Sequence, residues 1–371
     1  MTDQWQKAFE KLNEFINRHD EIKIGVDRTT IPESVRSEFY TLFDDTREAF
    51  IKDHSRFNVK RSIELSKNYH KAVKEVKELL HLTGISAPDN LNAFLSEPLK
   101  ALSRPLFDIL FKLIKGIIDI EQFGNESTIQ LKNYFNSLYR EGYEKWIILS
   151  LIKLLDANGL YEINVSELPK GGGAAMMAVD LSTEAIPPIT ESKRLVFKDS
   201  QPTTLSVVDC IIRSSISEDI YIGFRSATSR AMSYSVDCPI NRTRLPVNSA
   251  LQLLQGFVLV YTDTQPERIR LVNDMKYFYV PDLLICFKEQ QDWCNPEEMG
   301  RIQYVSKVIN PTLGIFIVSQ NPLQTHIEGV GYNNITFLHT DFDCSKLEPI
   351  AKTIAHMKEN ITDLVLNNNQ L

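Results

Sequence analysis

The chain has 371 residues, of which 43% are hydrophobic and 24% are charged. This is the composition of a globular protein, and it excludes a disordered or fibrous one. Lys and Arg number 41 against 48 Asp and Glu, which gives a formal net charge of −7. The chain as a whole is therefore not suited to hold nucleic acid or an anionic membrane, and any binding of a polyanion has to be local.

The N-terminus and the cysteines both favour a cytoplasmic protein. The first residues, MTDQWQKAFEKLNEF, contain no uninterrupted apolar stretch of the kind that a secretory signal needs. The five cysteines are odd in number and scattered, and they include no CxxC pair, which argues against a disulfide framework and against a structural zinc site. No motif in the sequence identifies a reaction.

The first 165 residues predict a helical domain, because apolar residues recur there at spacings of three and four and Gly and Pro are sparse. In residues 106–120 the charged side chains share one face, which predicts an amphipathic helix and not a membrane span. Residues 143–155 are almost entirely apolar, so we expect neighbouring elements to enclose them, with a helix end at Asn158-Gly159. The other helices are expected at 3–18, 32–53 and 59–82.

Residues 166–190 predict a linker or mobile loop, because they combine three consecutive glycines, small residues and a Pro pair. A glycine-rich phosphate loop is the alternative, but neither GxxxxGK[ST] nor GxGxxG is present. Residues 191–371 predict an α/β domain, so the expected fold class is α+β. The expected strands are 205–213, 219–225, 255–263, 268–274, 277–287, 313–320 and 335–341, and the expected helices are 296–309 and 345–361.

The arrangement expected for these strands is a mixed sheet. The first two strands flank a short polar segment and predict a hairpin. The last strands are separated by segments of helix length, which favours parallel neighbours.

The order of elements in the C-terminal half resembles a known family. Hairpin strands are followed by a helix, the strand GIFIVSQ and then the strand ITFLHTD with a helix after it. Over about residues 205–360 this order resembles the restriction-endonuclease-like fold, in particular the Mrr-type nucleases, in which a strand with a polar end follows the helix behind the active site. The resemblance implies DNA or RNA cleavage, with Mg²⁺ held by two carboxylates, and a place in prokaryotic antiviral or restriction machinery.

The residues that match the family's catalytic pattern are Asp274 and Asp282 as acids and metal ligands, and Lys288 as the lysine that stabilises charge on the phosphate. The family places Glu or Gln two residues before this lysine, whereas Cys286 stands there in this chain, so the metal site is incomplete. Glu289 does not replace it, because in one continuous strand Asp282 and Glu289 point to opposite faces. Mg²⁺ is expected only if the protein is an active nuclease, and otherwise no cofactor is expected.

Residues 223–244 predict a contact with phosphate. Guanidinium groups and small hydroxyls are the donors that phosphate oxygens accept, and the irregular pattern of this segment predicts an exposed loop. The alternative is a solvated loop whose arginines pair with acids elsewhere. The arginines of the segment are Arg225, Arg230, Arg242 and Arg244.

A second basic group lies on the expected helix 59–82. Lys67, Lys71 and Lys74 are spaced four and three apart, so they form one stripe that matches a phosphate backbone. The alternative is the solvated side of an ordinary amphipathic helix.

These observations give a functional hypothesis and an alternative. The hypothesis is a cytoplasmic, nucleic-acid-associated protein with a nuclease-like C-terminal domain. The alternative is a scaffold subunit that joins a protein partner, or a second copy of the chain, through residues 106–120 and 143–155. In that case it makes no contact with nucleic acid, and the net negative charge favours this alternative.

Overall fold

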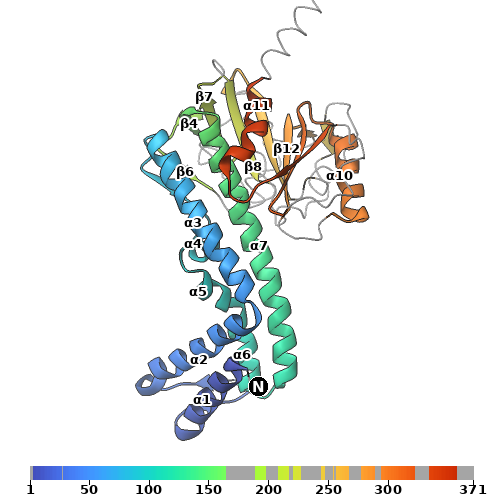
Figure 1. The fold of residues 1–371 in the computed structure, drawn as a ribbon. Coiled ribbons are helices and arrows are strands. Elements are labelled where there is room, and N and C mark those ends of the chain that lie inside the picture. The colour runs from blue at the N-terminus through green and yellow to red at the C-terminus, as the bar shows by residue number, and fades with distance from the viewer. Residues whose placement is uncertain are drawn as a thin grey trace, which may run out of the picture. The chain divides into compact units, whose positions relative to one another are not determined.

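The computed structural model describes residues 3–26, 28–163, 189–197, 208–216, 220–226, 244–246, 254, 256–266, 277–288, 294–321 and 334–356. The chain divides into two compact units (Figure 1). Unit 1 comprises the residues up to Tyr69 and Asp89–Gly142, and unit 2 comprises His70–Pro88 and the chain from Tyr143 onward. Two long helices, α3 (Arg56–Leu79) and α7 (Ile120–Leu154), contribute to both units.

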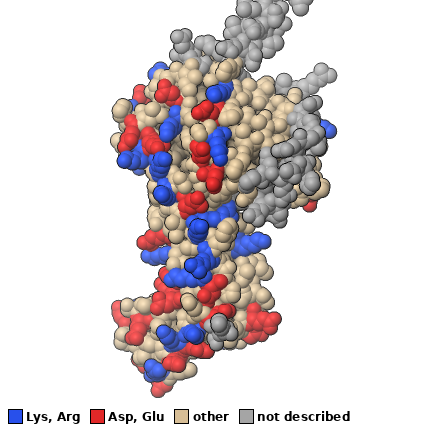
Figure 2. Space-filling view, in the orientation of Figure 1, with Lys and Arg blue, Asp and Glu red and all other residues tan. Residues whose placement is uncertain are grey.

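Unit 1 is helical and has an aromatic core. In the first helix the buried residues Trp5, Phe9, Leu12 and Phe15 follow the spacing of three and four that the sequence predicts. Charged side chains of both signs are interspersed over the visible surface (Figure 2). Besides parts of α3 and α7, the unit contains α1 (Gln4–Arg18), β1 (Lys23–Ile24), β2 (Thr29–Thr30), α2 (Glu33–His54), α4 (Asp89–Ser96), α5 (Pro98–Ser103), the 3-10 turn η1 (Arg104–Leu106) and α6 (Phe107–Ile114).

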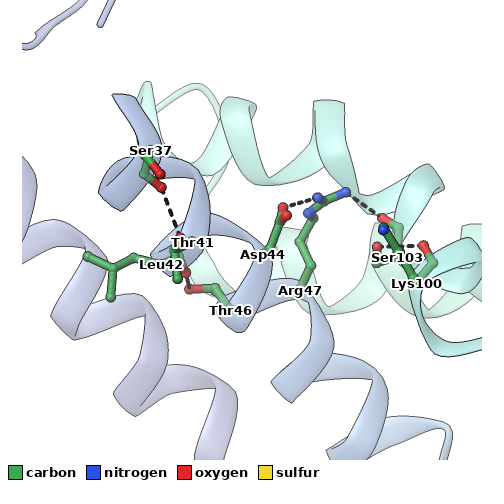
Figure 3. A network of polar contacts seen from close by, with 8 residues as sticks. All are labelled: Ser37, Thr41, Leu42, Asp44, Thr46, Arg47, Lys100 and Ser103. Atoms are coloured by element: carbon green, nitrogen blue, oxygen red, sulfur yellow. Dashed lines mark hydrogen bonds and ion pairs between the residues drawn. The ribbon is translucent and has the colours of Figure 1, made fainter. Parts of the chain in front are cut away.

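A buried arginine ties α2 to the chain around α5. Arg47 donates a hydrogen bond to the carbonyl oxygen of Ser103 at 2.9 Å and pairs with Asp44 (Figure 3). Its guanidinium also lies 5.1 Å from the ring centre of Phe43 and 5.3 Å from that of Phe107. A buried charge is stable only when it is paired and hydrogen-bonded, and these contacts meet that need.

The helix expected at 106–120 is shorter than the sequence predicts. Gly116 adopts a positive φ of +67°, and the amide of Ile117 donates to the carbonyl of Lys112 at 2.9 Å. This is the Schellman geometry that ends a helix with a glycine in the left-handed region. The chain therefore leaves α6 at this glycine, and α7 begins at Ile120.

Unit 2 contains an eight-stranded mixed sheet in the order β14-β13-β12-β10-β8-β7-β4-β5. The pairs β12–β13 and β13–β14 are parallel and the other pairs are antiparallel, so the predicted hairpin of β7 with β8 and the parallel neighbours are confirmed. The strands are β4 (Ala157–Ile163), β5 (Ile189–Glu191), β7 (Cys210–Ser214), β8 (Ile220–Ser226), β10 (Phe257–Asp263), β12 (Leu283–Lys288), β13 (Gly314–Ser319) and β14 (Ile335–His339).

Helices pack on both faces of this sheet. Leu284 and Cys286 of β12 belong to a core cluster with α10 (Pro296–Ile309). Phe287 points to the opposite face, as the alternation of a strand requires, and its ring stacks on Tyr143 of α7 with the centroids 3.7 Å apart. The segment 143–155 is therefore enclosed within its own unit, as the sequence predicts.

The remaining elements of unit 2 are short. The strands β3 (Gly84–Ser86) and β6 (Arg194–Val196) form a parallel pair, and β9 (Arg244–Pro246) and β11 (Tyr277–Tyr279) form an antiparallel pair. The 3-10 turn η6 (Cys344–Leu347) and α11 (Glu348–Ala355) follow β14. Within the part of the chain that the structure describes, none of the helices combines the length and the apolar character that crossing a bilayer requires.

Strand β4 is the element that the sequence places differently. It lies within the first 165 residues, which predict a helical domain, yet it pairs with β7 and β5 in the sheet of unit 2. The predicted linker 166–190 lies outside the described residues, apart from the first two residues of β5. The expected strand 268–274 also lies outside them.

The stacking of Phe287 on α7 predicts a large effect on stability. Replacement of this 3%-exposed ring by Ala leaves a cavity, and we expect the free energy of unfolding to fall by about 3–5 kcal/mol. The matched control is Phe57→Ala, which removes a ring that is 67% exposed and should change stability by less than about 0.5 kcal/mol. Urea denaturation followed by circular dichroism measures both values, and equal losses would contradict the packing described.

Candidate nucleic-acid interface

The first predicted phosphate contact, Arg225, is buried. Its Nη1 donates to a carboxylate oxygen of Asp209 at 2.5 Å, and the two side chains are 4% and 3% exposed. Arg225 is therefore a structural ion pair and not a contact for phosphate, which corrects the expectation. Arg230 and Arg242 lie outside the described residues, and the structure places only the backbone of Arg244, in β9.

The burial of Arg225 follows from its place in the sheet. Strand β8 lies between β7 and β10, and Arg225 pairs with Leu259 of β10. A cation in the interior of a sheet needs an acid at hydrogen-bond distance, and Asp209, directly before β7, supplies it. The charge of Arg225 also acts on the buried side chain of Tyr261. Burial raises the pKa of the Tyr261 hydroxyl, the Asp282 carboxylate raises this pKa further, and the Arg225 guanidinium lowers it.

Asp282 and Lys288, the two predicted catalytic residues that the structure describes, do not lie together. Asp282 precedes β12 and Lys288 ends it, so they are six residues apart and about 20 Å along the strand. Asp282 accepts hydrogen bonds from the backbone N–H and hydroxyl of Thr262 and from the hydroxyl of Thr312. Burial raises the pKa of its carboxyl, while these hydrogen bonds work against the increase. Asp274 lies outside the described residues.

Lys288 is held in an ion-pair network with helix α10. Glu298, in the first turn of α10, pairs with Lys288 and accepts a hydrogen bond from Arg301 at 2.8 Å. Burial by itself raises the pKa of the Glu298 carboxyl, but the hydrogen bonds from Arg301 and Lys288 outweigh it and lower this pKa to about 2. The network thus fixes α10 to the end of β12.

The described residues around Asp282 and Lys288 form no group of ligands suited to a magnesium ion, and Asp274, the other predicted ligand, lies outside the described residues. Among them, no three His, Cys, Asp or Glu side chains come together as a group that could hold a metal. Mg²⁺ requires near-octahedral oxygen ligands, and Asp282 is already engaged by two threonines while Glu298 is engaged by two cations. Asp282 and Glu298 are therefore both engaged by other groups of unit 2.

One of the two segments that the scaffold alternative assigns to a partner is buried inside unit 2. The alternative assigns residues 106–120 and 143–155 to a partner. In the structure, residues 143–155 are buried almost throughout, with Tyr143 stacked on Phe287 and its hydroxyl bonded to the carbonyl of Thr340 at 3.0 Å. That segment is the inner layer of unit 2 and offers no surface for docking.

The predicted lysine stripe lies on the surface of α3. Lys67, Lys71 and Lys74 are all exposed, as are Arg56 and Lys60 in the first turns of the helix. Because α3 is one uninterrupted helix with about 3.6 residues per turn, these five positions lie within about 60° of one another around its axis. We call them the α3 basic face. Figure 2 shows Lys and Arg side chains gathered over the region where Figure 1 labels α3 and α5.

Most cations of the α3 basic face are not neutralised. Lys74 pairs with Glu78 at 3.9 Å, one turn farther along the helix. Within the described residues, Arg56, Lys60, Lys67 and Lys71 form no ion pair with a carboxylate. The opposite face of the helix is buried and supplies its stability through Leu65, Tyr69, Ala72 and Val76.

The first turn of this surface lies outside the helix that the sequence predicts. The predicted helix begins at residue 59, whereas α3 begins at Arg56, so Arg56 and the exposed Phe57 extend the surface. The signal is present in the sequence, because positions 56, 60, 67, 71 and 74 are spaced four, seven, four and three apart, which places them on one face of a helix.

The chain was compared with protein-family models, with curated proteins and with solved structures, and no match was found in any of the three comparisons.

The Arg225–Asp209 pair predicts a defect in stability and not in binding. Arg225→Met leaves a buried carboxylate without its cation, so we expect the free energy of unfolding to fall by about 3–5 kcal/mol. The double variant Arg225→Met/Asp209→Asn removes the uncompensated charge and should recover part of the loss. Chemical denaturation measures both, and an unchanged stability of Arg225→Met would contradict the assignment of a structural role.

The Glu298 network predicts a dependence of stability on pH. The carboxyl has a lower pKa in the folded state, about 2, than its ordinary value of 4.5. Its contribution, roughly 3 kcal/mol at most, is therefore complete above about pH 5 and is lost as the pH falls toward 2. Wild type should exceed Glu298→Gln in stability at pH 6, and this difference should shrink between pH 5 and pH 3.

The control for this experiment is Glu348→Gln. This residue pairs with Lys352 at 3.1 Å on the exposed surface of α11, where an ion pair contributes about 0–1 kcal/mol. Denaturation curves at several pH values report both variants. A difference between wild type and Glu298→Gln that stays constant with pH would show that the carboxylate is not held by its two cations.

Proposed function

We propose that the protein binds nucleic acid through the α3 basic face. The observation that carries the proposal is a row of exposed cations, four of which form no ion pair with a carboxylate within the described residues. From Arg56 to Lys74 the row extends over 18 residues of helix, or about 27 Å. A polyanion of regular charge spacing is the partner that such a row matches.

The overall acidity of the chain does not oppose this proposal. At physiological ionic strength the Debye length is about 8 Å, so acids farther than this from the row are largely screened. The local sequence is strongly basic, since residues 52–74 contain seven Lys or Arg against the two acids Asp53 and Glu64. A phosphate chain on α3 therefore experiences the local positive charge far more than the net charge of −7.

The proposal for unit 2 is a nuclease-like fold without an assigned reaction. What supports the resemblance is the order of β10, β12, α10 and β13, in which an antiparallel pair is followed by a helix that leads to a parallel neighbour. We propose binding and not cleavage, because Asp282 and Lys288 stand at opposite ends of β12. The cytoplasmic location and the antiviral context remain predictions.

A salt-dependent binding experiment tests the proposed function. The full chain is titrated into fluorescein-labelled oligonucleotides of 20 residues, DNA and RNA, and anisotropy is recorded at 50 and 200 mM salt. We expect log Kd to rise linearly with log salt concentration, because binding releases condensed counterions. Lys60→Ala/Lys67→Ala should weaken binding and reduce the salt slope by about 1.4–1.8, the share of two phosphate contacts.

The charge-matched control is Lys7→Ala/Lys11→Ala. It removes two exposed lysines from α1 and changes the net charge by the same amount. This control should bind as wild type does. The proposed function is wrong if no oligonucleotide binds at 50 mM salt, or if both double variants weaken binding equally.

A further inference from the structure

A groove lies beside the first turns of the α3 basic face, entirely within unit 1. It has a volume of about 670 Å³ and is formed by the end of α2, the start of α3 and one residue of α5. Its apolar lining consists of Phe57, Val59, Ile63 and Leu99, and its charged lining consists of Lys52, Arg56 and Lys60. Among the residues that the structure describes, none of those lining the groove is acidic. We call it the Phe57 groove.

The aromatic ring in this groove is largely exposed. Phe57 is 67% exposed, and Ile63, two turns farther along α3, is 56% exposed. The Arg61 guanidinium lies 5.7 Å from the centre of the Phe57 ring and 4.2 Å from that of Tyr139, so Arg61 connects the ring to α7. Single exposed apolar side chains are ordinary on a protein surface, but here two lie in one groove whose rim is cationic.

We propose that the Phe57 groove holds an unstacked base of a single-stranded nucleic acid, with the neighbouring phosphates on Arg56 and Lys60. This inference rests on the proposed function and adds the class of nucleic acid to it. Proteins that bind single strands combine cations that follow the backbone with aromatic rings on which bases stack. Both elements are present here, because Phe57 lies between Arg56 and Lys60 along the first turns of α3.

Two properties of the groove favour a single strand over other polyanions. A duplex keeps the faces of its bases stacked inside, so it has nothing to place against an exposed ring, whereas a single strand presents them. The groove also lies in the size range of clefts that take small organic groups, about 300–1,000 Å³. An acidic polypeptide would match the cations, but it has no flat aromatic group in regular register with its charges.

The test compares single strands with a duplex on the full-length protein. The probes are fluorescein-labelled oligo(dT) and oligo(U) of 20 residues, and a 20-base-pair DNA duplex. Wild type should bind the single strands more tightly than the duplex at 100 mM salt. Phe57→Ala should weaken single-strand binding roughly tenfold or more and leave duplex binding unchanged, since base stacking on an aromatic ring is removed.

Two control variants separate stacking from a general loss of apolar surface. Phe57→Tyr keeps the aromatic ring and should retain single-strand affinity within about threefold. Ile129→Ala removes an apolar side chain that is 59% exposed on α7, outside the groove, and should bind as wild type does. Circular dichroism should report the same fold for all variants, because each substituted side chain is exposed.

The outcomes distinguish this inference from the proposed function. If Phe57→Ala binds single strands as wild type does while Lys60→Ala/Lys67→Ala binds weakly, the inference is overturned and the proposed function stands. If no oligonucleotide binds but fluorescein-labelled poly-Glu binds in a manner that depends on Phe57, both are overturned and the groove is a site for an acidic polypeptide.

Discussion

Like charges on neighbouring turns of α3 repel one another, and the proposed binding on the α3 basic face depends on this repulsion. Each pair of cations four residues apart, such as Arg56 and Lys60 or Lys67 and Lys71, destabilises an isolated helix by a few tenths of a kcal/mol. The helix forms because its opposite face buries Leu65 and Val76, each with no exposed surface. The positive row is therefore held in place by packing, and under the proposed function an anion that binds from solvent would relieve the repulsion within it.

The predicted cations of the unit 2 sheet are neutralised within the fold. Arg225 and Lys288 are the two predicted binding or catalytic cations whose side chains the structure describes in the sheet, and each pairs with an acid of the same unit. A guanidinium in the interior of a sheet has to be paired, since an isolated buried charge costs several kcal/mol. Arg225 and Lys288 thus stabilise the sheet and the contact of α10 with the end of β12, and they are not available to a ligand.

Local patterns in the sequence predict several helices and sheet strands, but not the contacts that neutralise the buried cations. The helix at 296–309 matches α10 residue for residue, because Asn295 caps it and Asn310 ends it in the left-handed region, and both signals are local. The predicted helix at 106–120 is longer than α6. The sequence shows an isolated glycine inside an apolar period, but it does not show that this glycine adopts the positive φ that ends the helix. The partners Asp209 and Glu298 could not be found, since each lies ten or more residues away along the chain from the cation it neutralises. The Phe57 groove likewise requires three separate segments to come together.

The most direct test of the α3 basic face is to locate a bound strand by photo-crosslinking. A 20-residue oligonucleotide that contains 4-thiothymidine is irradiated with the full-length protein, and the adduct is mapped by mass spectrometry after digestion with trypsin. Binding on the α3 basic face predicts adducts on the wild-type peptides Phe57–Lys60 and Ser62–Lys67. It predicts no adducts on the corresponding peptides of Lys60→Ala/Lys67→Ala, which trypsin releases as residues 57–61 and 62–71. Adducts confined to residues 223–244, with none on α3, would contradict it.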